Sequence, residues 1–394
     1  MKYWRGYLTA AIFAAISWAL MQVAEKYSTL VDMVYPYVTR SVQGFLTAWT
    51  VSYDFCVWQI VILVFLVLAL AALVLVFVFK GSIIQWFGWV LAAVSVVFCL
   101  HTGIYGLNHY AGPIENDLRL DMTDYTQAEL EEALIFYRDQ ANAIAVVLPR
   151  DEQGVVKFSD FTAMSQQAGA GFRWLVLNRS FSIFGGDYTP VKQLGWADLY
   201  SSVGISGYTC FVTGEAAVNP QIPAVSMPFV ICREMAHRMC VAREEEAAFA
   251  AYLACEASES QEYQYSAYFT AFRYCYNALY SVDSAAAVRI REGCARELLL
   301  DLDYYNNFFS SRRDEEAMEI SDTITSLNLV IRGDEDGIIS GGSVCDYLVN
   351  WYLAEYAVEE VLPEQLFDPY DETQVDLSGI VNAVIPNPDE EGAQ

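Results

Sequence analysis

The chain has 394 residues, of which 55% are hydrophobic and 14% aromatic, and its formal net charge is -27. This composition is too apolar for a disordered acidic chain, and so negative a protein repels nucleic acid and anionic lipid. The apolar residues are concentrated near the N-terminus, which predicts a membrane protein.

Three N-terminal runs, residues 7–24, 56–79 and 83–104, contain no formally charged side chain. A helix needs about 20 such residues to cross the hydrocarbon layer of a bilayer. We therefore expect a membrane region over residues 1–105 with three transmembrane helices, joined in part by a loop from Glu25 to Phe55. The first run lacks a good small-x-small cleavage site, so we interpret it as an uncleaved anchor rather than a signal peptide.

The positive residues near these runs predict the orientation. Lys2, Arg5 and Lys80 flank the runs without acidic neighbours, and such residues stay on the cytoplasmic side. The N-terminus is then inside, and three crossings place the C-terminal part outside the cytoplasm. The expected localisation is a multi-pass membrane protein with an extracytoplasmic domain, whose first partner is membrane lipid.

The remainder of the chain is long enough for one domain, predicted over residues 106–365. Only three of the 49 acidic and five of the 22 basic residues precede residue 111, so this domain is strongly acidic. It holds seven of the nine cysteines without a C-x-x-C pair, which favours buried free thiols over disulfides. Residues 366–394 combine proline and acidic residues with little periodicity, which predicts a disordered tail.

The domain sequence predicts a mainly α fold. Thr126 and Glu129 form a capping box at the start of an amphipathic stretch, and a second helix is expected over residues 158–167. Residues 204–219 differ, because Tyr208, Cys210 and Val212 alternate between glycine-bearing ends, which is typical of a short strand. From about residue 228 to residue 357 the helical pattern resumes.

Residues 233–237, "REMAH", have the spacing of the zinc-peptidase signature H-E-x-x-H, with arginine at the first histidine position. Positions i and i+4 of a helix face the same way, so that signature offers two imidazoles to one metal and sets its glutamate beside the metal-bound water as general base. The chemistry makes Glu234 the catalytic candidate and His237 a metal ligand. Arg233 cannot be a ligand, because a guanidinium stays protonated and has no lone pair to donate.

Two longer segments carry a resemblance: "TGEAAVN" at residues 213–219 and "REMAHRMCVAREEEAAFAAYLAC" at residues 233–255. They resemble a domain-of-unknown-function family of bacterial membrane proteins with the approximate patterns T-G-E-A-N-V-N and H-E-x-A-H-x-x-G-x-x-x-E-x-E-A-N-F-x-A-x-L-A-C. The resemblance implies a zincin-like, metallopeptidase-like domain, with zinc as the cofactor of active members. It also implies Glu244 as the third metal ligand, with Glu246 as second choice.

This chain departs from the family pattern at several positions. Arg233 replaces the first histidine, Ala217 and Ala248 replace asparagines, and Cys240 replaces a glycine. Three interpretations therefore remain open. The chain is an active zinc peptidase with a substitute ligand such as Cys240 or His109, or a metal-free relative in which Arg233 pairs with Glu244 or Glu246, or a membrane-anchored structural or binding protein. In the first case the strand from Tyr208 to Val212, with Cys210, aligns a peptide substrate.

Overall fold

The computed structural model describes residues 4–312 and 341–357. Four long helices come first: α1 (Arg5–Lys26), α2 (Ser28–Thr50), α3 (Val57–Val78) and α4 (Ile83–Ile104). Of these, α1, α3 and α4 are long and apolar enough to cross a membrane. This confirms three long apolar helices at the positions where the sequence predicts spans.

The prediction of a loop between the first two spans is wrong, because α2 fills most of that segment. Asp32, Pro36 and Arg40 interrupt its apolar residues, so it does not read as a membrane span. It is nevertheless a continuous helix of 23 residues with one polar and one apolar side. Counting charges detects helices that are apolar all round and misses amphipathic ones.

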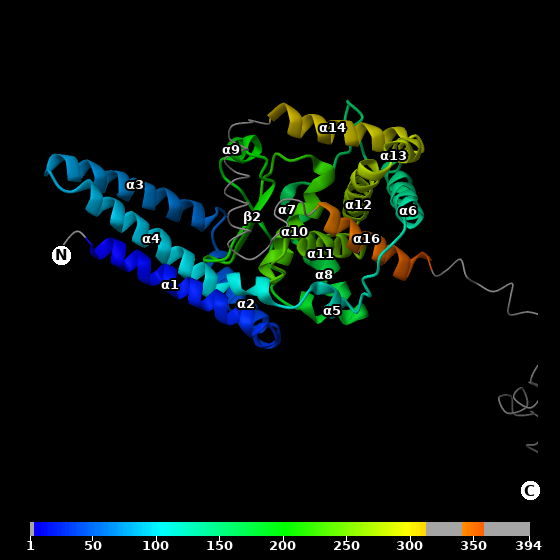
Figure 1. Ribbon diagram of the computed structural model, residues 1–394. Helices are drawn as coiled ribbons and strands as arrows, with labels where there is room; N and C mark the ends of the chain where they lie inside the picture. The colour runs from blue at the N-terminus through cyan, green and yellow to red at the C-terminus, as the bar shows by residue number, and fades with distance from the viewer. Residues whose placement is uncertain (1–3, 313–340, 358–394) are drawn as a thin grey trace, which may run out of the picture.

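The spans α1 and α4 lie side by side and reach away from the rest of the molecule (Figure 1). Glycines allow this close approach, since a Cβ on Gly6 would lie 2.4 Å from the carbonyl carbon of Gly88. The N-terminus and the turn between α3 and α4 are at the end of the spans far from the domain (Figure 1). Lys2 lies outside the described residues.

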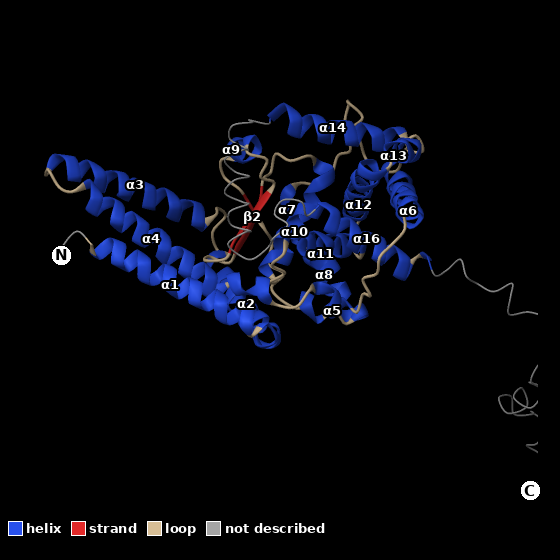
Figure 2. Ribbon diagram, in the orientation of Figure 1, coloured by secondary structure: helices blue, strands red, loops and turns tan. Residues whose placement is uncertain are grey.

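The domain that follows is built mainly from helices, which Figure 2 shows in blue around a small sheet. The capping box at Thr126 and Glu129 is present at the start of α6, which confirms that helix, and α7 confirms the helix expected over residues 158–167. The elements up to the sheet region are η1 (Gly106–Tyr110), α5 (Ile114–Leu118), α6 (Gln127–Ala145), α7 (Phe161–Gln167), α8 (Gly169–Trp174), the short π-helix η2 (Leu175–Arg179), η3 (Ser182–Phe184) and α9 (Ala197–Ser202). The later ones are η4 (Ala224–Ser226), α10 (Met227–Arg238), α11 (Glu244–Glu256), α12 (Gln261–Val282), α13 (Ser284–Arg291), α14 (Arg296–Arg312) and α16 (Gly341–Glu355).

The centre of the core is formed by α10 and α11, which are buried on almost every side. They pack against each other and against α12, while α8 and α16 also contact α11. The approach of α8 depends on Gly171, where a Cβ would lie 1.8 Å from the carbonyl oxygen of Ala254. All nine cysteines lie in the described residues as free thiols, as their spacing predicted.

The sheet has the order β1-β3-β2. Here β1 (Lys192–Gln193) runs parallel to β3 (Glu215–Val218), and β2 (Gly207–Cys210) runs antiparallel to β3 with Tyr208 opposite Ala217. The predicted strand therefore exists but is shorter than expected, because Val212 lies in the turn before Gly214, whose φ is +69°. The sequence did not predict β1 and β3. The first has only two residues, and the second, "EAAV", shows no alternation of polar and apolar residues.

The four long helices come first along the chain, and the helical domain follows them. The end of the predicted domain, after residue 357, and the predicted tail at residues 366–394 lie outside the described residues.

Candidate functional site

The backbone between α10 and α11 determines where the site residues point. At the end of α10 the amide of Cys240 donates to the carbonyl of His237 at 2.9 Å, and the amide of Val241 donates to that of Ala236 at 3.1 Å. These two bonds form a Schellman motif, which requires a left-handed residue at the position of Cys240. Its φ is +73°, a conformation that glycine adopts without strain and other residues rarely adopt.

The reversal brings the first residue of α11, Glu244, back to α10. Nε2 of His237 lies 3.0 Å from Oε2 of Glu244, and Nη1 of Arg233 lies 3.0 Å from Oε1. Arg233 also places Nη2 2.9 Å from Oε1 of Glu234. We call Arg233, Glu234, His237 and Glu244 the charged cluster. The i and i+4 positions of "REMAH" thus face one carboxylate, as helix geometry predicted.

The hydrogen bonds of His237 identify its protonation state. Nδ1 lies 3.0 Å from the carbonyl oxygen of Val241, which can only accept, so Nδ1 carries a hydrogen. Nε2 faces a carboxylate oxygen and forms a good hydrogen bond only if it also carries a hydrogen. Burial lowers the pKa of His237, but the carboxylates of Glu244 and Glu234 raise it, and the net pKa lies above its usual value. A protonated imidazole would donate from both nitrogens to these two acceptors.

Glu234 is closed in by the segment that leads into β2. Its side chain is 2% exposed, and Oε2 accepts a hydrogen bond of 2.8 Å from Oγ1 of Thr209. A Cβ on Gly207 would lie 2.5 Å from Oε1, so only glycine permits this approach. Arg233 also donates from Nη2 to Oγ of Ser206 at 3.2 Å. Both oxygens of Glu234 are therefore already engaged.

Glu244 lies at the outer side of the charged cluster, with 51% of its side chain exposed. Burial of the carboxylate raises its pKa, but the positive charges of Arg233 and His237 outweigh this and lower the pKa below its usual value. Glu244 is thus ionised at neutral pH and is shared between two cations. Because half of the side chain is in water, solvent screens part of this attraction.

These residues do not fit a zinc ion. In the described ranges, 4–312 and 341–357, no group of three or more His, Cys, Asp or Glu side chains is placed to hold a metal. Arg233 stands where the H-E-x-x-H signature has its first histidine, and its charge opposes a cation, so only His237 and Glu244 of the candidate ligands lie together.

The other candidate ligands lie elsewhere. Glu246 does not meet Arg233, because its carboxylate is bound by Arg243 at 2.6 Å and by the amide of Ile114 at 3.2 Å. The thiol of Cys240 accepts a hydrogen bond of 3.2 Å from Thr39 on α2. The backbone carbonyl oxygen of His109 accepts a hydrogen bond of 3.2 Å from Arg243.

Of the predicted peptide-aligning residues, Tyr208 is 46% exposed, with its ring centroid 5.0 Å from that of Trp58 at the start of α3. Cys210 is half-buried, and Val212 is outside the strand. The strand therefore lies between the charged cluster, which Thr209 contacts, and the first residues of α3.

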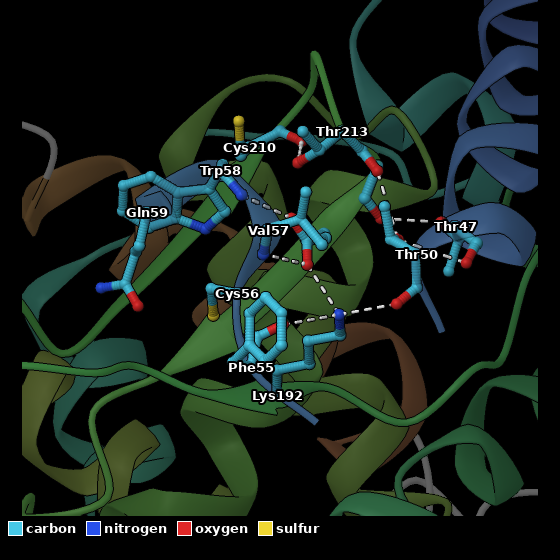
Figure 3. Close-up of polar contacts among 12 residues, drawn as sticks. Thr47, Thr50, Phe55, Cys56, Val57, Trp58, Gln59, Lys192, Cys210 and Thr213 are labelled. Atoms are coloured by element: carbon cyan, nitrogen blue, oxygen red, sulfur yellow. Dashed lines mark hydrogen bonds and ion pairs between the residues drawn. The ribbon is translucent and has the colours of Figure 1, made fainter. Parts of the chain in front are cut away.

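The segment "TGE", residues 213–215, has a role that the sequence did not indicate. The carboxylate of Glu215 accepts from the backbone amides of Val57 at 2.8 Å and Trp58 at 3.0 Å, and so caps the N-terminus of α3. Nζ of Lys192 lies 2.7 Å from Oε1 of Glu215 (Figure 3). The same ammonium also donates to the carbonyl oxygens of Thr50 at 2.8 Å and Phe55 at 3.0 Å.

The α2 helix is bound to the same turn. Oγ1 of Thr47 donates to the carbonyl of Gly214 at 2.7 Å, and Oγ1 of Thr50 donates to that of Thr213 at 3.3 Å (Figure 3). "TGE" therefore joins the sheet to α2 and α3. The only sequence signal for this junction was the short polar segment "TGE" itself, to which the proposed peptidase chemistry assigns no role.

A family model described as a protein of unknown function, DUF3810, matches residues 31–349 of the 394. The chain belongs to this family. The matched part of this DUF3810 protein includes α2, the spans α3 and α4, the sheet and the charged cluster. No curated protein and no solved structure matches the chain. Membership in a family of unknown function is thus confirmed, and the zincin-like relationship stays a prediction.

Proposed function

We propose that this DUF3810 protein is a membrane-anchored, zincin-like binding protein in which an arginine-centred ion-pair cluster replaces the metal of related peptidases. The observation that carries the proposal is the position of Arg233. Its guanidinium lies 2.9 Å from Glu234 and 3.0 Å from Glu244, the two carboxylates that the resemblance assigns as general base and metal ligand.

The physical argument is charge balance. Two carboxylates near each other repel unless a cation lies between them, and a metal supplies that cation in an active zincin. Arg233 supplies it here, with His237 as a second positive group on Glu244. The guanidinium hydrogen-bonds to these carboxylates directly, so Glu234 is held as a paired structural anion rather than as a free base.

The retained function that the geometry supports best is the binding of an extended peptide. The strand β2 lies at one end of the sheet order, and its Tyr208 is 46% exposed. An extended peptide binds to such a strand by adding to the sheet, and neighbouring side chains give specificity. The alternative of an active peptidase with a substitute ligand is one outcome of the experiment below.

The domain is proposed to lie outside the cytoplasm. Arg5 begins α1 and Lys80 lies in the turn between α3 and α4, both at the end of the spans far from the domain. Positive residues are retained in the cytoplasm, so the opposite end, with the domain, is then exported.

The deciding experiment measures zinc and proteolysis in the purified full-length protein in detergent. We expect the unmodified protein to contain little zinc and to leave peptide substrates intact, while Arg233→His gains zinc because it restores an imidazole four residues before His237. Arg233→Lys is the matched control, since it changes the side chain without providing a ligand. Stoichiometric zinc in the unmodified protein that is lost in His237→Ala would contradict the proposal and favour an active enzyme.

Peptide binding is measured separately with dye-labelled casein, an unstructured polypeptide, by fluorescence anisotropy. We expect binding by the unmodified protein and weaker binding by Tyr208→Ala. Equal binding by both proteins, or none by either, would contradict the assignment of β2 as the binding strand.

A further inference from the structure

The apolar side of α2 is exposed along its whole length. The exposed side chains recur three or four residues apart, with Ser41 as the polar member between Val38 and Phe45, which places them on one side of the helix. Leu30, Met33 and Val34 are followed by Tyr37 and Val38, then by Phe45, which is 74% exposed, and Trp49, which is 62% exposed. A stripe of this length is rare on a water-exposed surface and marks a site of contact with a partner or a membrane.

The polar side of α2 faces the domain instead. Thr39, Gln43, Thr47 and Thr50 are all buried. Gln43 donates to the carbonyl of Phe211 at 3.0 Å, and Thr47 donates to that of Gly214 at 2.7 Å. This is the reverse of a helix on a soluble protein, which buries its apolar side.

Both charged residues of α2 are also used by the domain. Oδ1 of Asp32 accepts from the amide of Gly112 at 2.9 Å, and Arg40 donates to the carbonyl of Ser182 at 3.3 Å. The contacts extend from Asp32, near the start of α2, to Thr50 at its end. A helix of 23 residues is about 35 Å long. The helix therefore lies along the domain surface and does not leave it.

The domain ends of the three spans lie next to α2. α1 ends at Lys26, two residues before α2 begins, and α3 begins at Val57, seven residues after α2 ends. The hydroxyl of Tyr35 on α2 donates to the carbonyl of Gly103 at the end of α4, at 3.0 Å. Because these ends mark the boundary of the hydrocarbon layer, α2 lies at that boundary.

We propose that α2 is an in-plane membrane helix, with its apolar stripe inserted between the lipids of the leaflet that faces the domain. Helices of this kind bury their apolar side about 5–10 Å into the boundary of headgroups and acyl chains. The aromatic residues Tyr37 and Trp49 on the stripe suit this level, where tyrosine and tryptophan are enriched. The partner is the bilayer itself, and α2 fixes the domain flat against it.

The charges also identify the kind of lipid contact. Membrane-surface helices that depend on anionic lipid present several lysines or arginines to the headgroups. α2 has a single basic residue, Arg40, which binds the domain. The insertion is therefore apolar and independent of headgroup charge.

The test uses full-length protein in lipid vesicles with a photoactivatable diazirine amino acid at one position. Phe45 is the test position, Val67 on α3 is the positive control, and Val282, which is 71% exposed at the end of α12, is the negative control. We expect lipid adducts at Phe45 in a yield that approaches that at Val67, with none above background at Val282.

Two further comparisons distinguish insertion into neutral lipid from binding to anionic lipid or to a second copy of the chain. Vesicles of phosphatidylcholine alone and vesicles with added phosphatidylglycerol should give equal yields at Phe45. Adducts at Phe45 to a second copy of the chain in place of lipid would overturn the proposal, and so would adducts to lipid only when anionic lipid is present. Labelling at Phe45 no higher than at Val282, while Val67 is labelled, would also overturn it.

Discussion

Arg233 forms an ion pair with its own sequence neighbour, Glu234, with Nη2 2.9 Å from Oε1. Adjacent residues of a helix point in different directions and do not normally meet. The contact forms because the long arginine side chain passes the carboxylate of Glu234 and also reaches Glu244. The side chain of Glu234 is 2% exposed. One guanidinium thus neutralises a buried and a half-exposed carboxylate.

This relationship predicts that Arg233→Met destabilises the protein. The change leaves Glu234 buried without its cation, and removing one partner of a buried pair costs about 3–5 kcal/mol, less where a partner is exposed as Glu244 is. We expect a loss of about 2–3 kcal/mol in the free energy of unfolding, from urea denaturation of the full chain in detergent followed by near-UV circular dichroism. The double change Arg233→Met with Glu234→Gln should recover most of it. If the double variant were as unstable as the single one, the loss would come from packing.

Cys240→Gly should be more stable than Cys240→Ala. Both changes remove the thiol, but only glycine relieves the left-handed backbone, where φ is +73°. A left-handed non-glycine residue costs about 1–2 kcal/mol, and the greater freedom of glycine in the unfolded chain removes part of that gain. We expect a difference of about 1 kcal/mol in thermal unfolding of the two variants. Equal stability would show that the backbone at this position carries no strain.

The charged cluster should contribute most to stability between about pH 4.5 and pH 6.5, the ordinary pKa values of its carboxyl and imidazole groups. The pKa of Glu244 is lowered, so its contribution is present above pH 4.5 and is lost as pH falls through the lowered pKa. The pKa of His237 is raised, so its contribution is full below pH 6.5 and is lost as pH rises through the raised pKa.

The measurement is the free energy of unfolding as a function of pH for the unmodified protein and for Glu244→Gln. The variant should lose both the acid-side and the alkaline-side dependence of the cluster, because the raised pKa of His237 depends on Glu244. Parallel curves for the two proteins would mean that the titrating groups lie outside the cluster.

Lys192→Met should loosen the junction between the sheet and the membrane region. It leaves the carboxylate of Glu215, whose side chain is 0% exposed, without its cation, and it removes the donor to Thr50 and Phe55. We expect faster proteolysis of the segment between α2 and α3 in the intact protein. Lys192→Arg, which keeps a positive charge beside Glu215, should retain more resistance than Lys192→Met, and equal proteolysis of the two variants would assign the effect to the lost contacts with Thr50 and Phe55.

The proposed orientation predicts that a reporter fused after Asn108 is exposed outside the cytoplasm. A second reporter in the turn at Lys80 should be cytoplasmic, since one crossing, α4, lies between Lys80 and Asn108. Alkaline phosphatase and green fluorescent protein fusions report the two sides. The reverse pattern would contradict the interpretation of Arg5 and Lys80.

The membrane helices and several local features could be predicted from the sequence alone. A run of about 20 uncharged residues has few alternatives to a span, because a bilayer satisfies no backbone polar group. The capping box at Thr126 and the helix around His237 follow from local spacing, while Glu244 as the partner of His237 was implied by the family resemblance. These are relationships between residues close in the sequence, where geometry permits few arrangements.

Contacts between distant segments were decided only by the tertiary structure. The sequence left Glu244 and Glu246 both open as partners of Arg233, and the fold chose Glu244 because Arg243 and the amide of Ile114 bind Glu246. The capping of α3 by Glu215 joins residues more than 150 positions apart. The polar side of α2 is buried because the domain offers it carbonyl oxygens, and no local pattern in the sequence records where those acceptors lie.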